Sequence, residues 1–238
     1  MKIVDMHCHI LPGIDDGSEN MDKSLAMLRK ATEQNIYSFI ATPHASGRYP
    51  KSQPDRVKEL CQELEKCAQK EISSQIRIRP GQELMWTEDM FRQLEEGKVL
   101  TLADSDHVLV EFLPTTPWSV IYRAAREFSM SPWRMILAHV ERYRVLRQRN
   151  RAEELLETGV QYQMNYTSIE GKVFDKKARW CRGLLKKEWI DYLGTDMHDV
   201  SWRAPKTEAA MQWMERHLDN GYIEAICRKN IKKLIEEG

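Results

Sequence analysis

Several features that mark particular classes of protein are missing from this 238-residue sequence. It has no run of about 18 apolar residues, so we expect no membrane-inserted segment. The first residues, MKIVDMHCHI, lack the apolar segment found in signal peptides, so we expect no secretory signal. Lysine plus arginine and aspartate plus glutamate each number 36, and the resulting net charge of zero argues against nucleic acid as a partner.

Cysteine is scarce and shows no pairing pattern. The five cysteines are odd in number, scattered, and without a CxxC motif: Cys8, Cys61, Cys67, Cys181 and Cys227. This usage is typical of reduced thiols in a cytoplasmic protein and not of a disulfide framework. The chain also has no low-complexity segment and no evident linker, so we expect a single domain over residues 1–238.

Apolar, β-branched segments recur about every thirty residues, and a helical pattern follows each one. The predicted strands are residues 3–9, 36–41, 75–80, 107–112, 134–139, 160–165 and 190–194. The predicted helices are residues 20–34, 54–68, 87–97, one opening at 117, 144–158, 174–188, 205–219 and 222–236. Strands that alternate with helices indicate an α/β protein with a parallel sheet, and seven of them suggest closure into a barrel. Catalytic residues of such barrels come from the carboxyl ends of the strands.

The most informative stretch is residues 3–17, IVDMHCHILPGIDDG. If its first half is a strand, His7 and His9 point to the same side, close enough to share one metal ion. The turn Asp15-Asp16-Gly17 can bring a carboxylate back over them. Imidazole with carboxylate suits zinc, manganese or iron. The alternative is a surface histidine pair beside an ordinary acidic turn.

Other predicted strand ends supply further candidate ligands: His44, Glu83, Glu111, His139, Asp196 and His198. Glu111 lies within VLVEF, where an ionised carboxylate is costly unless it is paired or bound to metal. The histidines could instead be hydrogen-bonding loop residues, and the glutamates could be ion-pair partners. Together with the first stretch they offer nine nitrogen and oxygen ligands, too many for one ion, so we predict a polynuclear metal site. His107 and His217 lie outside this pattern.

An ordered set of motifs adds a family resemblance. DMHCHILPGIDDG, ATPH, GQE, LVEF, AHVERY and GTDMHD, followed by Arg203, occur in this order between residues 5 and 203. In these motifs the chain resembles the polymerase-and-histidinol-phosphatase (PHP) family. More narrowly, it resembles the manganese-dependent protein-tyrosine phosphatases of bacterial capsule and exopolysaccharide operons, the CpsB type. The resemblance implies a distorted (βα)7 TIM-like barrel and a phosphotyrosine-bearing protein substrate, expected to be the tail of a bacterial tyrosine kinase.

The resemblance also implies a role for each candidate. The ligands of a first ion would be His7, His9, Glu83 and Asp196. Glu83 would bridge to a second ion, completed by Glu111 and His139. The ligands of a third ion would be Asp16, His44 and His198. Arg142 and Arg203 match the phosphate-binding arginines, and two to three ions are expected, Mn²⁺ foremost, with Fe, Co or Zn as alternatives.

The chemistry of this ligand set suits a phosphate ester. Four carboxylates against three divalent ions leave about two positive charges, which favours a phosphate dianion and lowers the pKa of a bound water. A metal-bound hydroxide would then attack phosphorus in line. This route needs no cysteine nucleophile. No cysteine has an arginine six residues later, so the loop of the thiolate phosphatases is absent. Strand alternation places Cys8 away from the histidines.

Three other functions stay open from the sequence. The chain could hydrolyse a small phosphomonoester such as histidinol phosphate, act as a PHP nuclease, or bind phosphotyrosine as a regulatory protein with weak turnover. Four aromatic residues near the ligand loops could line a slot for a phenol ring or simply pack: Tyr49, Trp86, Trp118 and Trp202.

Overall fold

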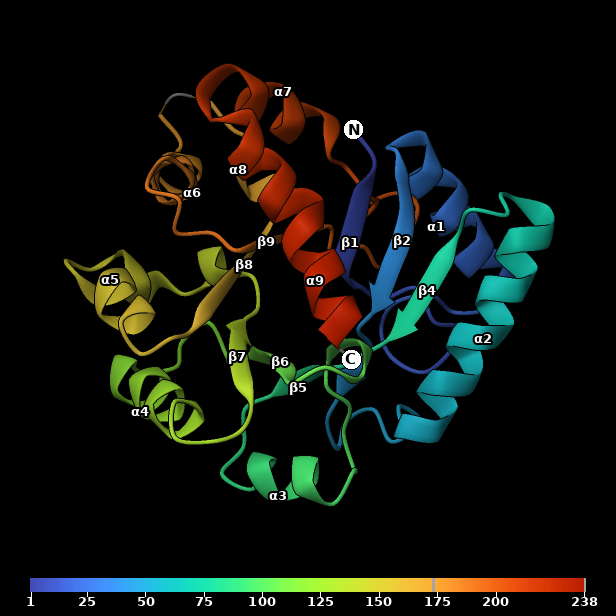
Figure 1. The fold of residues 1–238 in the computed structure, drawn as a ribbon, viewed down its shortest axis with the longest axis horizontal. Coiled ribbons are helices and arrows are strands. Elements are labelled where there is room, and N and C mark those ends of the chain that lie inside the picture. The colour runs from blue at the N-terminus through green and yellow to red at the C-terminus, as the bar shows by residue number, and fades with distance from the viewer. Residues whose placement is uncertain (173, 238) are drawn as a thin grey trace.

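The computed structural model describes residues 1–172 and 174–237. Its strands are β1 (Ile3–Cys8), β2 (Ile36–Ala41), β3 (His44–Ala45), β4 (Arg77–Pro80), β5 (Glu83–Met85), β6 (His107–Glu111), β7 (Arg134–Leu137), β8 (Gln161–Asn165) and β9 (Tyr192–Gly194). Every paired strand is parallel to its neighbour, in the orders β1-β2-β4 and β3-β5-β6-β7-β8-β9. A bridge between Cys8 and Met197 brings the two sheets together beside β1 and β9. The strands therefore curl into an incomplete parallel barrel (Figure 1).

Each of the seven predicted strands has a counterpart, and two short strands follow where none was predicted. β3 comes directly after β2, and β5 directly after β4. Pro43 lies between β2 and β3, and a proline cannot donate a ladder hydrogen bond, so the chain leaves one sheet there and pairs in the other. The parallel α/β class is confirmed, whereas the seven-fold count of the barrel stays a prediction.

The helices lie mostly outside this curl (Figure 1). They are α1 (Met21–Glu33), α2 (Pro54–Glu71), α3 (Met90–Glu95), α4 (Trp118–Phe128), α5 (Arg151–Leu156), α6 (Lys176–Lys186), α7 (Glu208–His217), α8 (Asn220–Glu224) and α9 (Asn230–Glu237), with a π-helical segment, Ala225–Lys229, joining the last two. The predicted helix over 144–158 is wrong in its first half. Arg144–Arg147 is a 3-10 turn, and Asn150 takes a left-handed conformation with φ of 65°, which ends any helix before α5 begins.

Two apolar clusters hold the layers together. The larger one fills the space between the outer helices and the strands. The smaller one lies inside the curl, where Met6, Leu109 and Ile136 pack against Ile231 and Leu234 of α9. The carboxyl-terminal helix thus packs against the inner faces of strands whose carboxyl ends carry the candidate ligands.

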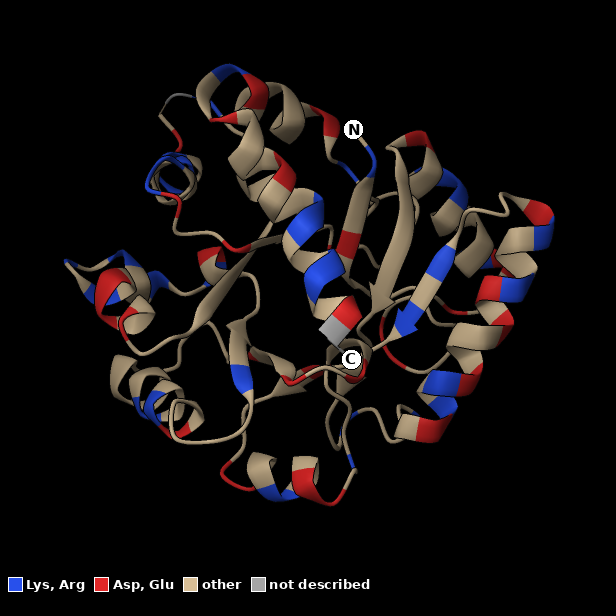
Figure 2. Ribbon diagram, in the orientation of Figure 1, with Lys and Arg blue, Asp and Glu red and all other residues tan. Residues whose placement is uncertain are grey.

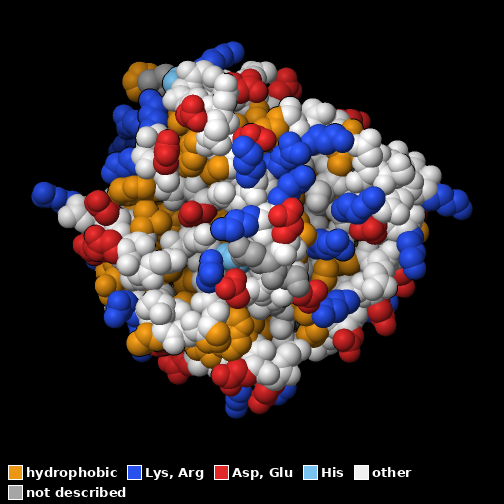
Figure 3. Space-filling view, viewed as in Figure 1, with side chains coloured by type: hydrophobic (Ala, Val, Ile, Leu, Met, Phe, Trp, Pro, Cys, Tyr) orange, Lys and Arg blue, Asp and Glu red, His pale blue; other side chains and the backbone are white. Residues whose placement is uncertain are grey.

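Charge is spread over the surface rather than gathered by sign on the face in view. Acidic and basic residues both occur on most helices (Figure 2), and both colours are interspersed across that face (Figure 3). α6 is an exception, with basic side chains and no acidic one (Figure 2). Among residues 1–172 and 174–237, no helix combines the length and apolar character that crossing a bilayer requires.

Candidate metal centre

All nine predicted ligands meet at one end of the strands: seven lie at or after the carboxyl ends of β1, β6, β7 and β9, while His44 and Glu83 begin β3 and β5 just after β2 and β4 end. His7 lies on β1, His44 on β3, Glu83 on β5 and Glu111 on β6, and the others come from the segments that follow β1, β7 and β9. Their donor atoms form four overlapping groups, in each of which the atoms lie within 4.8 Å of one another. The groups are His7–His9–Asp196, His7–Glu83–His139, His44–Glu83–Glu111 and His9–Asp16–His44–His198.

Glu83 stands at the middle of the cluster. Its Oε2 atom lies 3.2 Å from His7 Nε2, 3.3 Å from His9 Nε2 and 3.2 Å from His44 Nδ1. This oxygen is buried and has no hydrogen-bond partner of suitable geometry. Ligands bound at about 2.1 Å to a common ion lie roughly 3 Å apart, so the spacing fits a carboxylate shared with imidazoles around a cation. The donor set therefore fits divalent metal.

Two further carboxylates, those of Asp16 and Glu111, lie beside His44 and complete the groups that contain it. Asp16 Oδ1 lies 3.5 Å from His44 Nε2 and 3.5 Å from His198 Nε2. Glu111 Oε1 lies 3.0 Å from His44 Nδ1, and its Oε2 lies 3.7 Å from His139 Nε2. His44 therefore stands between two groups, with one ring nitrogen toward each. Burial lowers the pKa of His198 to about 4, which keeps that imidazole neutral and able to coordinate.

Three of the imidazoles are oriented by a hydrogen bond at the far ring nitrogen. His9 Nδ1 lies 2.7 Å from Asp15 Oδ2, His7 Nδ1 lies 3.1 Å from Gln163 Oε1, and His198 Nδ1 lies 3.0 Å from the Asp196 carbonyl. Because each Nδ1 faces an acceptor, the geometry assigns the proton to Nδ1 and leaves Nε2 directed at the cluster.

From the sequence, the turn Asp15-Asp16-Gly17 was expected to supply a carboxylate, without a separate role for Asp15, and Gln163 was not predicted. Asp15 lies beside the predicted ligand Asp16 in this turn and orients His9. Gln163 lies on β8, the strand that offered no ligand; its Oε1 also accepts from the His139 backbone N–H at 2.6 Å. Asn165 on the same strand donates to Asp196 Oδ2 at 2.9 Å. β8 therefore supports the ligands instead of supplying one.

The backbone takes a left-handed conformation at two of the ligands. His139 has φ of 34° and Asp196 has φ of 53°, a conformation that costs side chains other than glycine free energy. This conformation turns both side chains toward the cluster as β7 and β9 end. The strands also approach closely, because a Cβ on Gly194 would lie 2.7 Å from His7 Cβ. A hydrogen bond also links β1 to the segment after β9, because the Thr195 backbone N–H donates to the buried Asp5 Oδ1 at 2.9 Å.

The two predicted phosphate-binding arginines lie at the edge of the cluster. Arg203 Nη2 donates to Asp196 Oδ1 at 2.8 Å, and Arg142 Nη2 donates to Asp196 Oδ2. Although burial raises the pKa of Asp196, His7 and Arg142 lower it overall, so the carboxylate is ionised. About a third of each arginine side chain is exposed, so both side chains are accessible to solvent while they contact Asp196.

Three residues that the sequence placed outside the ligand set, Cys8, His107 and His217, also lie outside it in the structure. Cys8 is fully buried, its thiol donates to the Ile40 carbonyl, and burial raises the pKa of the thiol well above its ordinary value. His107 Nδ1 lies 2.9 Å from Asp106 Oδ1, and the His217 ring stacks on that of Trp213 with ring centroids 4.6 Å apart. None of these three belongs to the four groups of donor atoms.

Of the four aromatic candidates, Tyr49 stacks on a predicted ligand. Its ring lies 5.3 Å from that of His44, with an interplanar angle of 13°. Trp86 instead packs among phenylalanines of the core, Trp118 contacts Tyr122, and Trp202 is 89% exposed. The structure therefore separates one aromatic residue beside the centre from three that pack or face solvent.

Comparison with known proteins adds an assignment to this geometry. The model of the family described as capsular polysaccharide synthesis, CpsB/CapC, matches residues 3–236. This chain belongs to the CpsB/CapC family. Tyrosine-protein phosphatase YwqE of Bacillus subtilis is 30% identical over 90% of this chain and 84% of its own length. Tyrosine-protein phosphatase CpsB of Streptococcus pneumoniae is 27% identical over 98% of both chains.

Solved structures agree with the CpsB/CapC assignment. A chain from the structures of YwqE from Bacillus subtilis and CpsB from Streptococcus pneumoniae, described as metal-dependent tyrosine phosphatases, superposes with a TM-score of 0.88 and 26% identity, covering 99% of this chain and 95% of that one. Histidinol phosphate phosphatase from Lactococcus lactis, at 14% identity and a TM-score of 0.55, covers 99% of this chain and 93% of its own and shares the fold alone.

Proposed function

We propose that this chain is a metal-dependent protein-tyrosine phosphatase that hydrolyses phosphotyrosine on a protein substrate. The observation that carries the proposal is the convergence of nine nitrogen and oxygen ligands around Glu83, whose buried Oε2 lacks a hydrogen-bond partner. The CpsB/CapC relatives supply the reaction, since those proteins are named tyrosine-protein phosphatases. We assign the barrel to the PHP type with a (βα)7 count.

The proposed ligand assignment follows the family's arrangement. A first ion is held by His7, His9, Glu83 and Asp196, a second by Glu83, Glu111 and His139, and a third by Asp16, His44 and His198. The donor groups in the structure support sharing of Glu83, because its two oxygens lie near different histidines. Imidazole and carboxylate donors suit Mn²⁺, with Fe, Co or Zn able to occupy the same set.

Divalent ions, when bound, supply a water of lowered pKa and positive charge for the phosphate oxygens. The chain's own residues perform the rest. Arg142 and Arg203 lie at the solvent side of the ligands and offer planar N–H forks that bind phosphate oxygens bidentately. Asp15 and Gln163 hold His9 and His7 in the tautomer that coordinates, so the centre is preorganised before substrate arrives.

The proposed partner is a phosphotyrosine-bearing protein, specifically the tail of a bacterial tyrosine kinase that controls capsule or exopolysaccharide synthesis. CpsB and CapC relatives carry phosphatase names, and the matching family is one of capsular polysaccharide synthesis. We propose a cytoplasmic location on the basis of the unpaired cysteines. The balanced charge and the apolar pattern favour neither nucleic acid nor membrane insertion.

The test compares two substrates under steady-state conditions. We expect kcat/KM for a phosphotyrosine peptide to exceed that for histidinol phosphate, with many turnovers per enzyme. Glu111→Ala should abolish the peptide reaction, whereas Glu88→Ala, at an exposed glutamate, should not. A preference for histidinol phosphate would assign the chain to small phosphomonoesters. A single turnover at most would make it a phosphotyrosine-binding regulator.

A further inference from the structure

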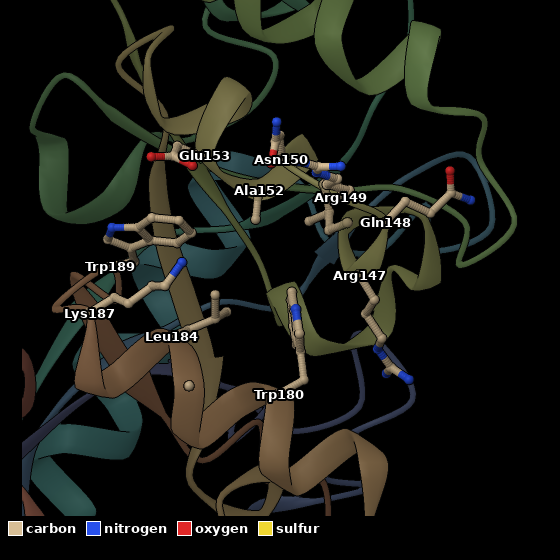
Figure 4. Close-up of a pocket in the computed structure, with 12 residues that line it drawn as sticks. Arg147, Gln148, Arg149, Asn150, Ala152, Glu153, Trp180, Leu184, Lys187 and Trp189 are labelled. Atoms are coloured by element: carbon tan, nitrogen blue, oxygen red, sulfur yellow. The ribbon is translucent and has the colours of Figure 1, made fainter.

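A cavity lies on the flank of the barrel, between α5, α6 and the loop that precedes α5. Its volume is about 270 Å³, and none of the nine predicted ligands lines it. Trp180 and Trp189 stand on two sides, with Leu184 and Ala152 between them (Figure 4). We call this cavity the α5–α6 pocket. It combines an apolar, aromatic interior with a rim of polar and charged side chains.

The rim is basic on a chain whose net charge is zero. Residues 144–151 contain four arginines and no acidic residue, and α6 contains five basic residues and no acidic one. Arg147, Arg149 and Lys187 line the pocket, against one acidic side chain, Glu153. Over residues 144–189 the sequence has eleven lysines and arginines but six aspartates and glutamates. Positive charge is therefore concentrated where the cavity opens.

Two of the rim cations, Arg149 and Lys187, form no ion pair within residues 1–172 and 174–237. Lys187 Nζ lies 3.9 Å from the centre of the Trp189 ring, and the Arg147 guanidinium lies 5.7 Å from that of Trp180. Each indole thus has a cation beside it, an arrangement that suits a ligand carrying both an aromatic ring and negative charge.

The pocket is connected to the metal centre by one short loop. The 3-10 turn Val140–Arg142 carries the proposed phosphate-binding arginine, and the next turn, Arg144–Arg147, forms the pocket wall. Arg147 Nη2 donates to the Glu141 carbonyl at 2.7 Å, which ties the wall to the residue before Arg142. A polypeptide bound at the metal centre can therefore follow this loop to the pocket.

We propose that the α5–α6 pocket docks an acidic, tyrosine-containing segment of the substrate polypeptide, apart from the phosphotyrosine that is hydrolysed. An aromatic side chain enters between Trp180 and Trp189, and carboxylates pair with Arg149 and Lys187. The volume of about 270 Å³ is just below the range of small-ligand pockets, which begins at roughly 300 Å³, and so suits one side chain better than a whole metabolite. This inference rests on the proposed function for its substrate.

The experiment compares three phosphotyrosine peptides and p-nitrophenyl phosphate. One peptide has five residues, and each of the two long peptides extends it at one end by ten residues rich in Asp, Glu and Tyr. Ten extended residues span about 33 Å. We expect the holoenzyme to show a KM about tenfold lower for one long peptide than for the short one. Arg149→Glu combined with Lys187→Glu should remove that difference, leaving kcat and p-nitrophenyl phosphate hydrolysis unchanged.

The matched control reverses two charges on the other side of the molecule. Lys66→Glu combined with Lys70→Glu alters exposed residues of α2, which lies opposite α5 and α6 (Figure 1). This variant should keep the low KM for that long peptide. Equal KM values for all three peptides in the unaltered enzyme would overturn docking. So would a pocket variant that loses binding to phosphatidylserine vesicles but keeps its peptide KM, since the rim would then serve a membrane surface.

A binding measurement separates this inference from the proposed function. The ten-residue extension without phosphotyrosine is titrated into holoenzyme by calorimetry, where turnover plays no part. Binding that is lost in the pocket variant but kept in the α2 control supports docking, even if no phosphotyrosine peptide is hydrolysed. Absence of binding to the unaltered enzyme contradicts docking, even if hydrolysis is fast. The affinity should fall as salt is added, because the rim charges are exposed.

Discussion

At the scale of single residues, the centre depends on side chains that orient the ligands as much as on the ligands themselves. Asp15 shows this most clearly. Its Oδ2 faces both the His9 ring N–H, at 2.7 Å, and the His44 backbone N–H, at 3.0 Å, while its Oδ1 accepts from the Gly17 backbone N–H. One carboxylate thus fixes the positions of two predicted ligands and the turn that carries a third.

Asp15→Asn should therefore weaken metal binding without removing a ligand. An amide has one oxygen where the carboxylate has two, so at least one of these three N–H groups loses its acceptor. Loss of such a partner typically lowers metal affinity by about 10- to 100-fold. Titration of Mn²⁺ by calorimetry would measure the change. Asp22→Asn, at an exposed position on α1, is the control, and equal affinities for the two variants would remove Asp15 from this role.

The buried Cys8 tests the nature of the nucleophile. Because burial raises the pKa of its thiol and the side chain packs against β2, Cys8→Ser should leave kcat for a phosphotyrosine peptide within a few-fold of the unaltered enzyme. Metal content is measured in parallel. A loss of more than about a thousandfold in kcat with metal retained would show that the thiolate is the nucleophile after all.

Arg142 and Arg203 should separate substrate binding from metal binding. Neither is a metal ligand, so Arg142→Ala and Arg203→Ala should keep full metal content, while kcat/KM falls about a hundredfold through the loss of one charged donor. Arg144→Ala, two residues along the same loop and exposed, is the control. Unchanged kinetics would exclude that arginine from the reaction, and lost metal would make it a support for Asp196.

At the scale of elements, the strand β9 carries a titratable group at the end opposite the ligands. Asp191 precedes the strand, its Oδ2 accepts from the Tyr162 backbone N–H at 2.7 Å, and burial raises the pKa of Asp191 to about 6. The folded chain therefore holds this proton more tightly than the unfolded chain does. The associated stability is present below about pH 4 and is lost as the pH rises through about 6.

Asp191→Asn should remove this pH dependence. The amide resembles the protonated acid and can still accept from Tyr162, so the variant should gain about 1–3 kcal/mol over the unaltered chain between pH 4 and pH 7. Urea unfolding at several pH values measures the difference between the two proteins. Asp22→Asn serves as the exposed control. A gain that is constant across this range would exclude titration of Asp191 as the cause.

The elements also show which patterns predict structure well. Apolar, β-branched segments predicted the strands, and the helix predicted from residue 54 begins at Pro54 in the structure. The helix expected over 144–158 failed because periodicity does not reveal a left-handed residue such as Asn150. β3 and β5 were missed because strands of two or three residues are too short to show alternation; their pairing depends on the neighbouring sheet.

At the scale of the whole molecule, the sequence placed all nine candidate ligands at one end of the sheet, and the structure brings them together there. The parallel direction of the strands made that prediction possible, because the carboxyl ends of parallel strands lie at the same edge of the sheet. What orients the ligands was not predictable, since Gln163 and Asn165 act across strands far apart in the chain. The basic flank was also hidden, because a net charge of zero says nothing about where each sign lies. The single-domain organisation over residues 1–238 stays a prediction.

The measurement that tests the central claim most directly is a metal titration followed by activity. Protein stripped with a chelator is reloaded with Mn²⁺ stepwise, and bound metal and phosphotyrosine-peptide hydrolysis are measured at each step. We expect no turnover at the start and full turnover only when about two to three equivalents are bound, since nine ligands serve more than one ion. Full turnover with less than about one equivalent, or in the presence of the chelator, would contradict the account.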